Sequence, residues 1–158
     1  MASSNKNLSS NRPTQLKDPK SLQIGIVVSS WNEEVTEALY SGALSTLMDA
    51  GISKEQIERR NVPGSFELPL GAQWLARRDD IDAVICLGCI IQGETRHFDF
   101  ICASCANGIT EVGLKYDKPV AFGVLTTDNL KQAMDRAGGK YGNKGDEAAS
   151  TILEMLNY

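Results

Sequence analysis

Apolar residues follow two patterns along this chain: short continuous runs and longer stretches with helical spacing. Continuous runs are typical of strands covered on both faces, and they occur at residues 22–28, 82–88 and 119–125. A fourth run, 56–62, contains Glu58, Arg59 and Arg60. The sequence therefore predicts four strands, the second of them at an exposed edge of the sheet.

Helical spacing of apolar residues follows each predicted strand. Asn32 is the expected N-cap of the first helix, which ends at Gly51. Further helices are predicted over 68–77, from His97 onward, over 129–137 and close to the C-terminus. The apolar stripes are Val35, Leu39, Ala43 and Leu47 in the first helix, Phe98, Ile101, Cys102, Cys105, Ile109 and Val112 in the third, and Ala148, Ala149, Ile152, Leu153 and Leu156 in the last.

The alternation of strands and helices predicts an α/β fold of three αβα layers. Four parallel strands form the sheet, and helices cover both faces through right-handed crossovers. Ligands of such sheets bind beyond the carboxyl ends of the strands, here in the turns 29–32, 63–67, 89–97 and 126–128. Residues 22–158 are predicted to be one domain, and residues 1–21, rich in Ser, Asn and Lys, a flexible arm.

Charge and composition narrow the possible partners. A net charge of -4 argues against nucleic acid, because phosphate neutralisation needs a basic face. The sequence has no apolar stretch near the roughly 20 residues that a membrane span needs, and no apolar segment of a secretory signal. The four cysteines have apolar neighbours, which suits a reducing compartment. The expectation is a cytoplasmic protein.

Residues 88–95 almost match the nucleotide-binding pattern G-x-x-x-x-G-K-[ST], with Glu94 where the lysine belongs. A carboxylate at that position reverses the charge that holds the outer phosphates, which argues against a nucleoside triphosphatase. The backbone at a helix start still suits one phosphate, with a cation supplied from elsewhere. The alternative is a tight turn whose glycines serve steric needs only.

The cysteines form two C-x-x-C pairs that superficially resemble a zinc ribbon. Cys86 lies inside a predicted buried strand, and its odd offset from Cys89 directs the two side chains to opposite faces. Cys102 and Cys105 belong to the apolar stripe of a helix. No metal site is therefore expected.

Several polar and aromatic residues fall at the predicted ligand edge. His97 lies in the first turn of a helix, where an imidazole can transfer protons near neutral pH. Trp31 either covers the core edge or stacks on a flat ring. Ser65 and Glu67 are either helix caps or partners for ligand hydroxyls. Arg136 either offsets a helix dipole or supplies the missing phosphate cation.

Together these residues resemble the 6,7-dimethyl-8-ribityllumazine synthase family, over about residues 24–155. Four motifs carry the resemblance: Trp31-Asn32, residues 62–69 (VPGSFELP), residues 88–98, and Arg136-Ala137-Gly138 followed by residues 142–145 (GNKG). The resemblance implies a flavodoxin-like fold and a cofactor-independent transferase of riboflavin biosynthesis. That enzyme condenses 5-amino-6-ribitylamino-uracil with 3,4-dihydroxy-2-butanone 4-phosphate and releases phosphate and water.

The resemblance also implies roles for individual residues. Trp31 would stack on the pyrimidine, His97 would transfer protons, and Arg136 would bind phosphate. Substrate contacts would come from Ser65, Phe66, Glu67, Cys89, Ile90, Ile91, Phe122 and Lys144, and the phosphate cradle from Gly93, Glu94 and Thr95. Phe122 and Arg136 would reach a neighbouring subunit's site in a homopentamer, and twelve pentamers form a shell in some relatives. Riboflavin synthase is a further expected partner.

Two residues depart from the family pattern. Glu94 replaces a small residue, and Gln92 replaces a frequent basic one. Both alter the side chains around the phosphate, whereas a backbone cradle survives if Glu94 points to solvent. The alternatives to the enzyme are a non-catalytic binder of flavins or ribityl compounds and a structural shell protein with a vestigial site.

Overall fold

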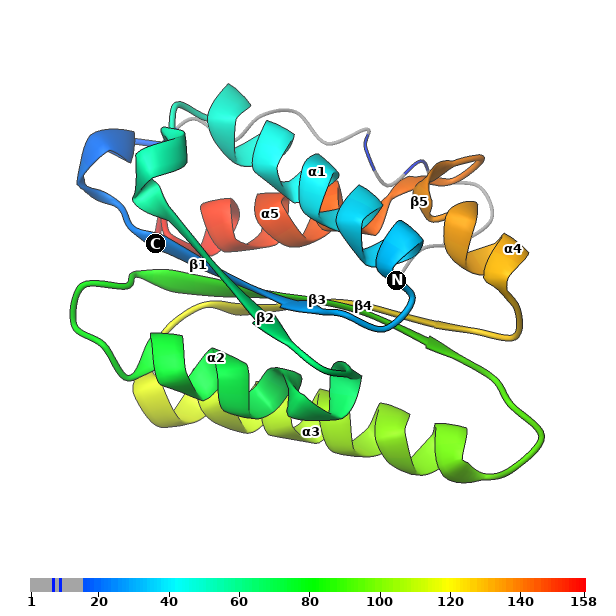
Figure 1. Ribbon diagram of the computed structural model, residues 1–158. Helices are drawn as coiled ribbons and strands as arrows, with labels where there is room; N and C mark the ends of the chain where they lie inside the picture. The colour runs from blue at the N-terminus through cyan, green and yellow to red at the C-terminus, as the bar shows by residue number, and fades with distance from the viewer. Residues whose placement is uncertain (1–6, 8, 10–15) are drawn as a thin grey trace.

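Four parallel strands form the central sheet, in the order β2-β1-β3-β4 (Figure 1). They are β1 (Ile24–Ser29), β2 (Ile57–Val62), β3 (Ala83–Ile91) and β4 (Val120–Thr127). The computed structural model describes residues 7, 9 and 16–158. Within these residues, each of the four predicted strands is present and the prediction of a parallel sheet is confirmed.

Helices cover both faces of this sheet, which confirms the three layers. On one face lie α1 (Glu33–Asp49), α4 (Leu130–Met134) and α5 (Lys144–Met155), and on the other α2 (Leu68–Ala76) and α3 (His97–Tyr116) (Figure 1). Three short 3₁₀ helices precede or join these elements: η1 (Pro19–Ser21), η2 (Lys54–Gln56) and η3 (Ser65–Glu67). None of the helices among the described residues is long and apolar enough to cross a membrane.

Two apolar cores hold the layers together, one on each side of the sheet. Side chains of β1 alternate between them, with Ile26 and Val28 facing α1 and α5 and Val27 facing α2 and α3. The predicted stripes of the first, third and last helices pack into these cores. Leu39 and Leu47 in α1 are fully buried. Truncating either to alanine is therefore expected to cost about 2–5 kcal/mol of stability.

The edge strand β2 carries ion pairs on its exposed side. Glu58 accepts hydrogen bonds from Arg60 and from Arg78, at 2.8 and 2.7 Å. Arg59 pairs with Glu37 of α1 and lowers the pKa of that carboxyl. The predicted position of this strand at the sheet edge is confirmed.

Two boundaries differ from the predictions at the carboxyl edge. β3 continues three residues beyond Gly88, because β4 is also longer than predicted and pairs with it as far as Thr127. Gln92 N–H then donates to the carbonyl of Thr127 at 2.8 Å. Residues 89–91 therefore belong to a strand and not to the predicted turn.

The prediction of one helix over 129–137 is wrong for its last three residues. The chain leaves α4 at Met134 and forms an antiparallel hairpin of β5 (Ala137–Gly139) and β6 (Gly142–Asn143). Gly138 and Gly142 have φ angles of 107° and 84°, a backbone conformation that favours glycine. The sequence pattern does not predict this hairpin.

The predicted arm, residues 1–21, lies mostly outside the described residues. Its last part does contact the domain: Leu16 packs against the core beneath α1 and α5. Gln56 Nε2 donates to the carbonyls of Pro19 and Leu22, at 2.8 and 2.5 Å. The chain is thus fixed to the domain before β1 begins.

Candidate active site

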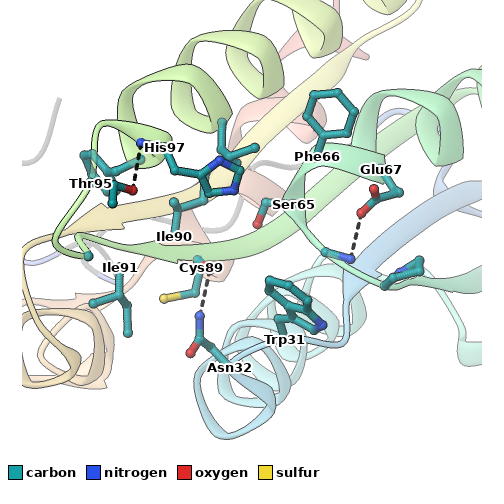
Figure 2. Close-up of a pocket in the computed structure, with 15 residues that line it drawn as sticks. Trp31, Asn32, Ser65, Phe66, Glu67, Cys89, Ile90, Ile91, Thr95 and His97 are labelled. Atoms are coloured by element: carbon teal, nitrogen blue, oxygen red, sulfur yellow. Dashed lines mark hydrogen bonds between the residues drawn. The ribbon is translucent and has the colours of Figure 1, made fainter.

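A pocket of about 690 Å³ lies at the carboxyl ends of β1, β2 and β3. This is where a parallel α/β sheet places its ligand. Three of the four predicted turns contribute to it, namely those after β1, β2 and β3. Its lining residues are Trp31, Asn32, Pro63, Gly64, Ser65, Phe66, Glu67, Cys89, Ile90, Ile91, Gly93, Thr95, His97, Phe98 and Ile101 (Figure 2).

Trp31 forms an exposed aromatic wall of this pocket, with 72% of its surface accessible. Its backbone is fixed to the turn after β2, because Trp31 N–H donates to the carbonyl of Pro63 at 3.1 Å. The next residue, Asn32, has a left-handed backbone, with φ of 58°. These constraints place the indole at the pocket mouth instead of over the core, which leaves its faces available to a flat ligand.

Asn32 occupies the predicted N-cap position of α1, but its side chain does not cap that helix. The Asn32 amide instead donates to the backbone carbonyl of Cys89 at 2.9 Å (Figure 2). The expected capping bond is therefore wrong. Asn32 links the turn after β1 to the pocket segment of β3.

The segment after β2 forms the wall next to Trp31 (Figure 2). Glu67 closes its own turn by accepting a hydrogen bond from Gly64 N–H at 2.9 Å. Ser65 is buried, whereas Phe66 is 54% exposed at the rim. In Figure 2 the Ser65 oxygen points toward the space between Ile90, Cys89 and Trp31. The Glu67 carboxylate therefore closes the 3₁₀ turn η3 and does not cap α2, so the interpretation as a cap of that helix is wrong, while Ser65 presents its hydroxyl to the pocket floor.

The strand end Cys89–Ile91 provides the floor. Cys89 belongs to the core under α1 and α5, and Cys86 to the core under α2 and α3. Their predicted opposite orientation is confirmed. Burial raises the pKa of the Cys89 thiol to about 11, which keeps it protonated at neutral pH. Cys89 is thus a small apolar lining residue and not a nucleophile.

The loop before α3 completes the pocket. Gly93, Thr95 and His97 line it, while Glu94 between them is exposed and does not. His97 N–H donates to Thr95 Oγ1 at 3.4 Å, so the hydroxyl lies at the start of the helix (Figure 2). A Cβ built on Gly93 would meet no atom within 4 Å. The backbone here is open to an anion, and the first turn of a long helix favours one.

Three predicted site residues, Phe122, Arg136 and Lys144, do not line this pocket; we call them the distal group. Phe122 lies on the edge strand β4 and is 37% exposed. Arg136 follows α4 and Lys144 begins α5, both on the sheet face opposite α2 and α3 (Figure 1). The single chain therefore brings together only part of the predicted site.

Within the distal group, Arg136 has a defined orientation. Its Nη1 donates to the carbonyl of Gln132 at 3.0 Å, and its guanidinium carbon lies 4.8 Å from the centre of the Tyr141 ring. Lys144 Nζ pairs with Glu147 at 2.6 Å. Among the described residues no carboxylate pairs with Arg136, so its charge is available to another anion.

Sequence reasoning did not assign five of the lining residues to the site. They are Asn32, Pro63, Gly64, Phe98 and Ile101. Phe98 and Ile101 were assigned to the core stripe of α3, and they do pack against that core while their edges reach the pocket. Their position in the first turns of the helix after the phosphate loop was the available signal.

The protein has a flavodoxin-like α/β fold. Its ligand pocket lies at the carboxyl edge of the sheet, between an aromatic side chain and the start of a helix. These features define its class. The comparison of its sequence with family models narrows the class further. The chain belongs to the 6,7-dimethyl-8-ribityllumazine synthase family, whose model matches residues 21–158.

Individual relatives agree with this assignment along the whole chain. The chain is 64% identical over 156 residues to a 6,7-dimethyl-8-ribityllumazine synthase of Cytophaga hutchinsonii, covering 99% of this chain and 98% of the relative. It is 50% identical over 158 residues to that of Parabacteroides distasonis, covering 100% and 99%. The one from Flavobacterium johnsoniae is 48% identical over 155 residues, covering 98% and 82%. The non-enzymatic alternatives are not favoured.

Proposed function

We propose that this protein condenses 5-amino-6-(D-ribitylamino)uracil with 3,4-dihydroxy-2-butanone 4-phosphate to 6,7-dimethyl-8-ribityllumazine, releasing phosphate and water. One observation supports this best: a single pocket combines an aromatic wall at Trp31, a polar segment at 65–67 and a helix-start loop at 93–97. The first two suit a pyrimidine with a polyhydroxyl chain, and the third suits a phosphate.

The pocket residues then have distinct roles. Trp31 stacks on the pyrimidine ring, and Ser65, Phe66 and Glu67 contact the ring and the ribityl chain. Cys89, Ile90 and Ile91 form the floor beneath the ring. The backbone at Gly93, Glu94 and Thr95 holds the phosphate, with the Glu94 side chain in solvent. His97 transfers protons at the edge between the two substrates.

In the reaction the amine of the pyrimidine attacks the ketone and an imine forms. Elimination of phosphate and closure of the second ring follow. Each step needs a proton moved near the reacting atoms, and His97 lines the same pocket as the phosphate loop and Trp31. Holding two substrates together also removes much of the entropic cost of their meeting. The protein therefore supplies orientation and proton transfer, and no cofactor is required.

The distal group supplies the remaining contacts from a neighbouring subunit of a homopentamer. Two observations support this: Phe122, Arg136 and Lys144 lie outside the pocket of their own chain, and Arg136 has no carboxylate partner among residues 16–158. In the neighbour's pocket, Arg136 would pair with the phosphate, Phe122 would cover the ring opposite Trp31, and Lys144 would meet the pyrimidine. A shell of twelve such pentamers is the larger assembly that we propose.

We also propose a cytoplasmic location and riboflavin synthase, which would use the product, as a partner. Sedimentation velocity separates a pentamer from a shell by mass. A monomer at micromolar concentration would contradict the shared site.

The direct test mixes purified, chelator-treated protein with both substrates and follows lumazine absorbance and phosphate release. We expect both signals to rise in equal amounts, well above the slow spontaneous reaction. Rates equal to the spontaneous reaction would contradict the proposed function.

A further inference from the structure

Ser29 is the last residue of β1 and carries a buried polar group that the structure leaves without a partner. Its surface is 0% exposed, and among the described residues its hydroxyl is the buried side-chain group with no hydrogen bond. Burying an unpaired hydroxyl costs free energy, so such groups in a folded protein call for a physical explanation. Neither the fold nor the roles proposed above account for it.

Ser29 lies beside the part of β3 that leads into the pocket floor. In the register of the sheet, Ser29 lies beside Val62, immediately before the segment that carries Ser65. On its other side Val28 pairs with Leu87, which places Ser29 next to Gly88 of β3. Ser29 is thus at the meeting point of the three strands whose ends form the pocket.

The hydroxyls of Ser29 and Ser65 both lie close to the backbone of Gly88, without a hydrogen bond between them. A Cβ built on Gly88 would lie 2.7 Å from Ser65 Oγ and 3.3 Å from Ser29 Oγ. Both hydroxyl oxygens therefore border the space above Gly88 that a side chain would fill. Ser65 itself is 7% exposed and lines the pocket, whereas Ser29 is fully buried and does not line it.

We propose that Ser29 is a positioning residue that acts through Ser65 on the pyrimidine substrate. A serine hydroxyl has one proton to donate and two lone pairs to accept with. When a carbonyl or hydroxyl oxygen of the substrate accepts the proton of Ser65, the Ser29 hydroxyl donates to the Ser65 oxygen. Ser29 thereby gains in the complex the partner that it lacks in the free protein. This proposal rests on the proposed function for the identity of the substrate.

The proposal predicts effects of a Ser29 substitution on stability and on binding that a serine with only a structural role would not show. Removing the Ser29 hydroxyl relieves an unpaired buried group in the free protein, so stability should be unchanged or higher. The same change should weaken binding of the pyrimidine, because Ser65 loses the group that orients its proton. Stability and binding are therefore expected to move in opposite directions.

The test compares Ser29→Ala, Ser65→Ala, the double variant and Ser150→Ala in the full chain. Ser150 is a buried serine of α5, on the other side of the sheet, and serves as the matched control. The measurements are the melting temperature without ligand and the KM of each substrate. For Ser29→Ala we expect a melting temperature no lower than that of the parent protein. We also expect a 3- to 10-fold higher KM for the pyrimidine and an unchanged KM for the phosphorylated substrate.

The double variant tests whether the two serines act as one unit. We expect its KM for the pyrimidine to equal that of Ser65→Ala alone, because Ser29 acts only through Ser65. An unchanged KM in Ser29→Ala, or independent effects that multiply in the double variant, would overturn the proposal while leaving the enzyme intact. Absence of turnover in the parent protein would instead overturn the proposed function, and with it the substrate assigned to Ser29.

Discussion

The pocket and the distal group differ in how the fold brings their residues together. Residues of the pocket follow β1, β2 and β3, whose carboxyl ends are adjacent because the strands are parallel neighbours. In the distal group, Phe122 comes from the edge strand β4, and Arg136 and Lys144 flank the hairpin on the sheet face covered by α1 and α5. Sheet topology alone assembles the first set, whereas we propose that the second set completes the site of another copy of the chain.

The two regions also hold their side chains differently. Backbone hydrogen bonds fix the pocket walls, as in the Trp31 bond to Pro63 and the Glu67 bond to Gly64. In the distal group, the Arg136 side chain is oriented by a carbonyl and by the Tyr141 ring, without an opposing charge among the described residues. An arginine without a carboxylate partner can form a charge-assisted hydrogen bond with a phosphate. This is the role that we propose for Arg136 at a neighbouring site.

The largest expected effect belongs to His97 in the pocket. Replacing His97 by alanine removes the proposed proton transfer and should lower kcat by about 10- to 1,000-fold. Stopped-flow absorbance of the lumazine at saturating substrates measures it. Asp99→Asn is the control. Asp99 is exposed in the same helix turn and does not line the pocket, so this variant should keep the parent kcat. An unchanged kcat in His97→Ala would exclude the histidine from the chemistry.

Replacing Arg136 tests the role of the distal group. The expected effect is smaller than that of His97 and falls mainly on one substrate. Arg136→Ala removes a charge-assisted contact and should raise KM for the phosphorylated substrate by about 10- to 100-fold, with a much smaller change for the pyrimidine. Lys131→Ala removes an equal charge from α4, where Lys131 is exposed and paired with Asp135 at 3.2 Å. That control should leave both constants unchanged. Equal increases for the two substrates would count against a phosphate role.

Tyr141 should show a smaller effect of the same kind. The ring lies against the Arg136 guanidinium, and such contacts contribute about 0.5–1 kcal/mol at exposed sites, or about 2- to 5-fold in binding. We therefore expect Tyr141→Leu to raise KM for the phosphorylated substrate by that factor, and Tyr141→Phe to leave it unchanged. Loss of binding in both variants would point to the hydroxyl and not to the ring.

The Cys89 thiol should react very slowly with alkylating reagents. This is expected if Cys89 is a packed residue of the pocket floor and not a nucleophile. With a pKa of about 11 instead of the roughly 8.5 of a free thiol, its thiolate fraction at pH 8 is at least about 100-fold lower. Alkylation by iodoacetamide, followed by mass spectrometry, should be slower by that factor than in the same protein unfolded in guanidinium. Rapid labelling of Cys89 in the folded protein would contradict this description of the floor.

The sequence predicted the pocket far better than the distal group, for physical reasons. Continuous apolar runs identify buried parallel strands, and the topology rule then places Trp31, Ser65 and His97 at one edge. The extension of β3 through Ile91 was missed, because it depends on pairing with β4 and not on local pattern. The hairpin at 137–143 was also missed, since glycine-rich stretches do not distinguish a break from a turn of defined geometry.

Side-chain partners were the least predictable feature. Asn32 has the residue type and position of an N-cap, yet its left-handed backbone directs the amide to Cys89. The unpaired hydroxyl of Ser29 depends on the approach of Gly88 from a strand about 60 residues away in sequence. Such contacts follow from tertiary packing, which a single sequence does not encode in its local pattern.

Subunit complementation tests the shared site most directly. Co-expressed His97→Ala and Arg136→Ala chains, purified through two different tags, would form mixed pentamers. In these mixed pentamers, about one quarter of the interfaces would join an intact His97 to an intact Arg136. At a low concentration of phosphorylated substrate, we predict that activity recovers to about one quarter of the parent level, far above either variant alone. Activity equal to the mean of the two separate variants would show that both residues act within one chain, and would contradict the account.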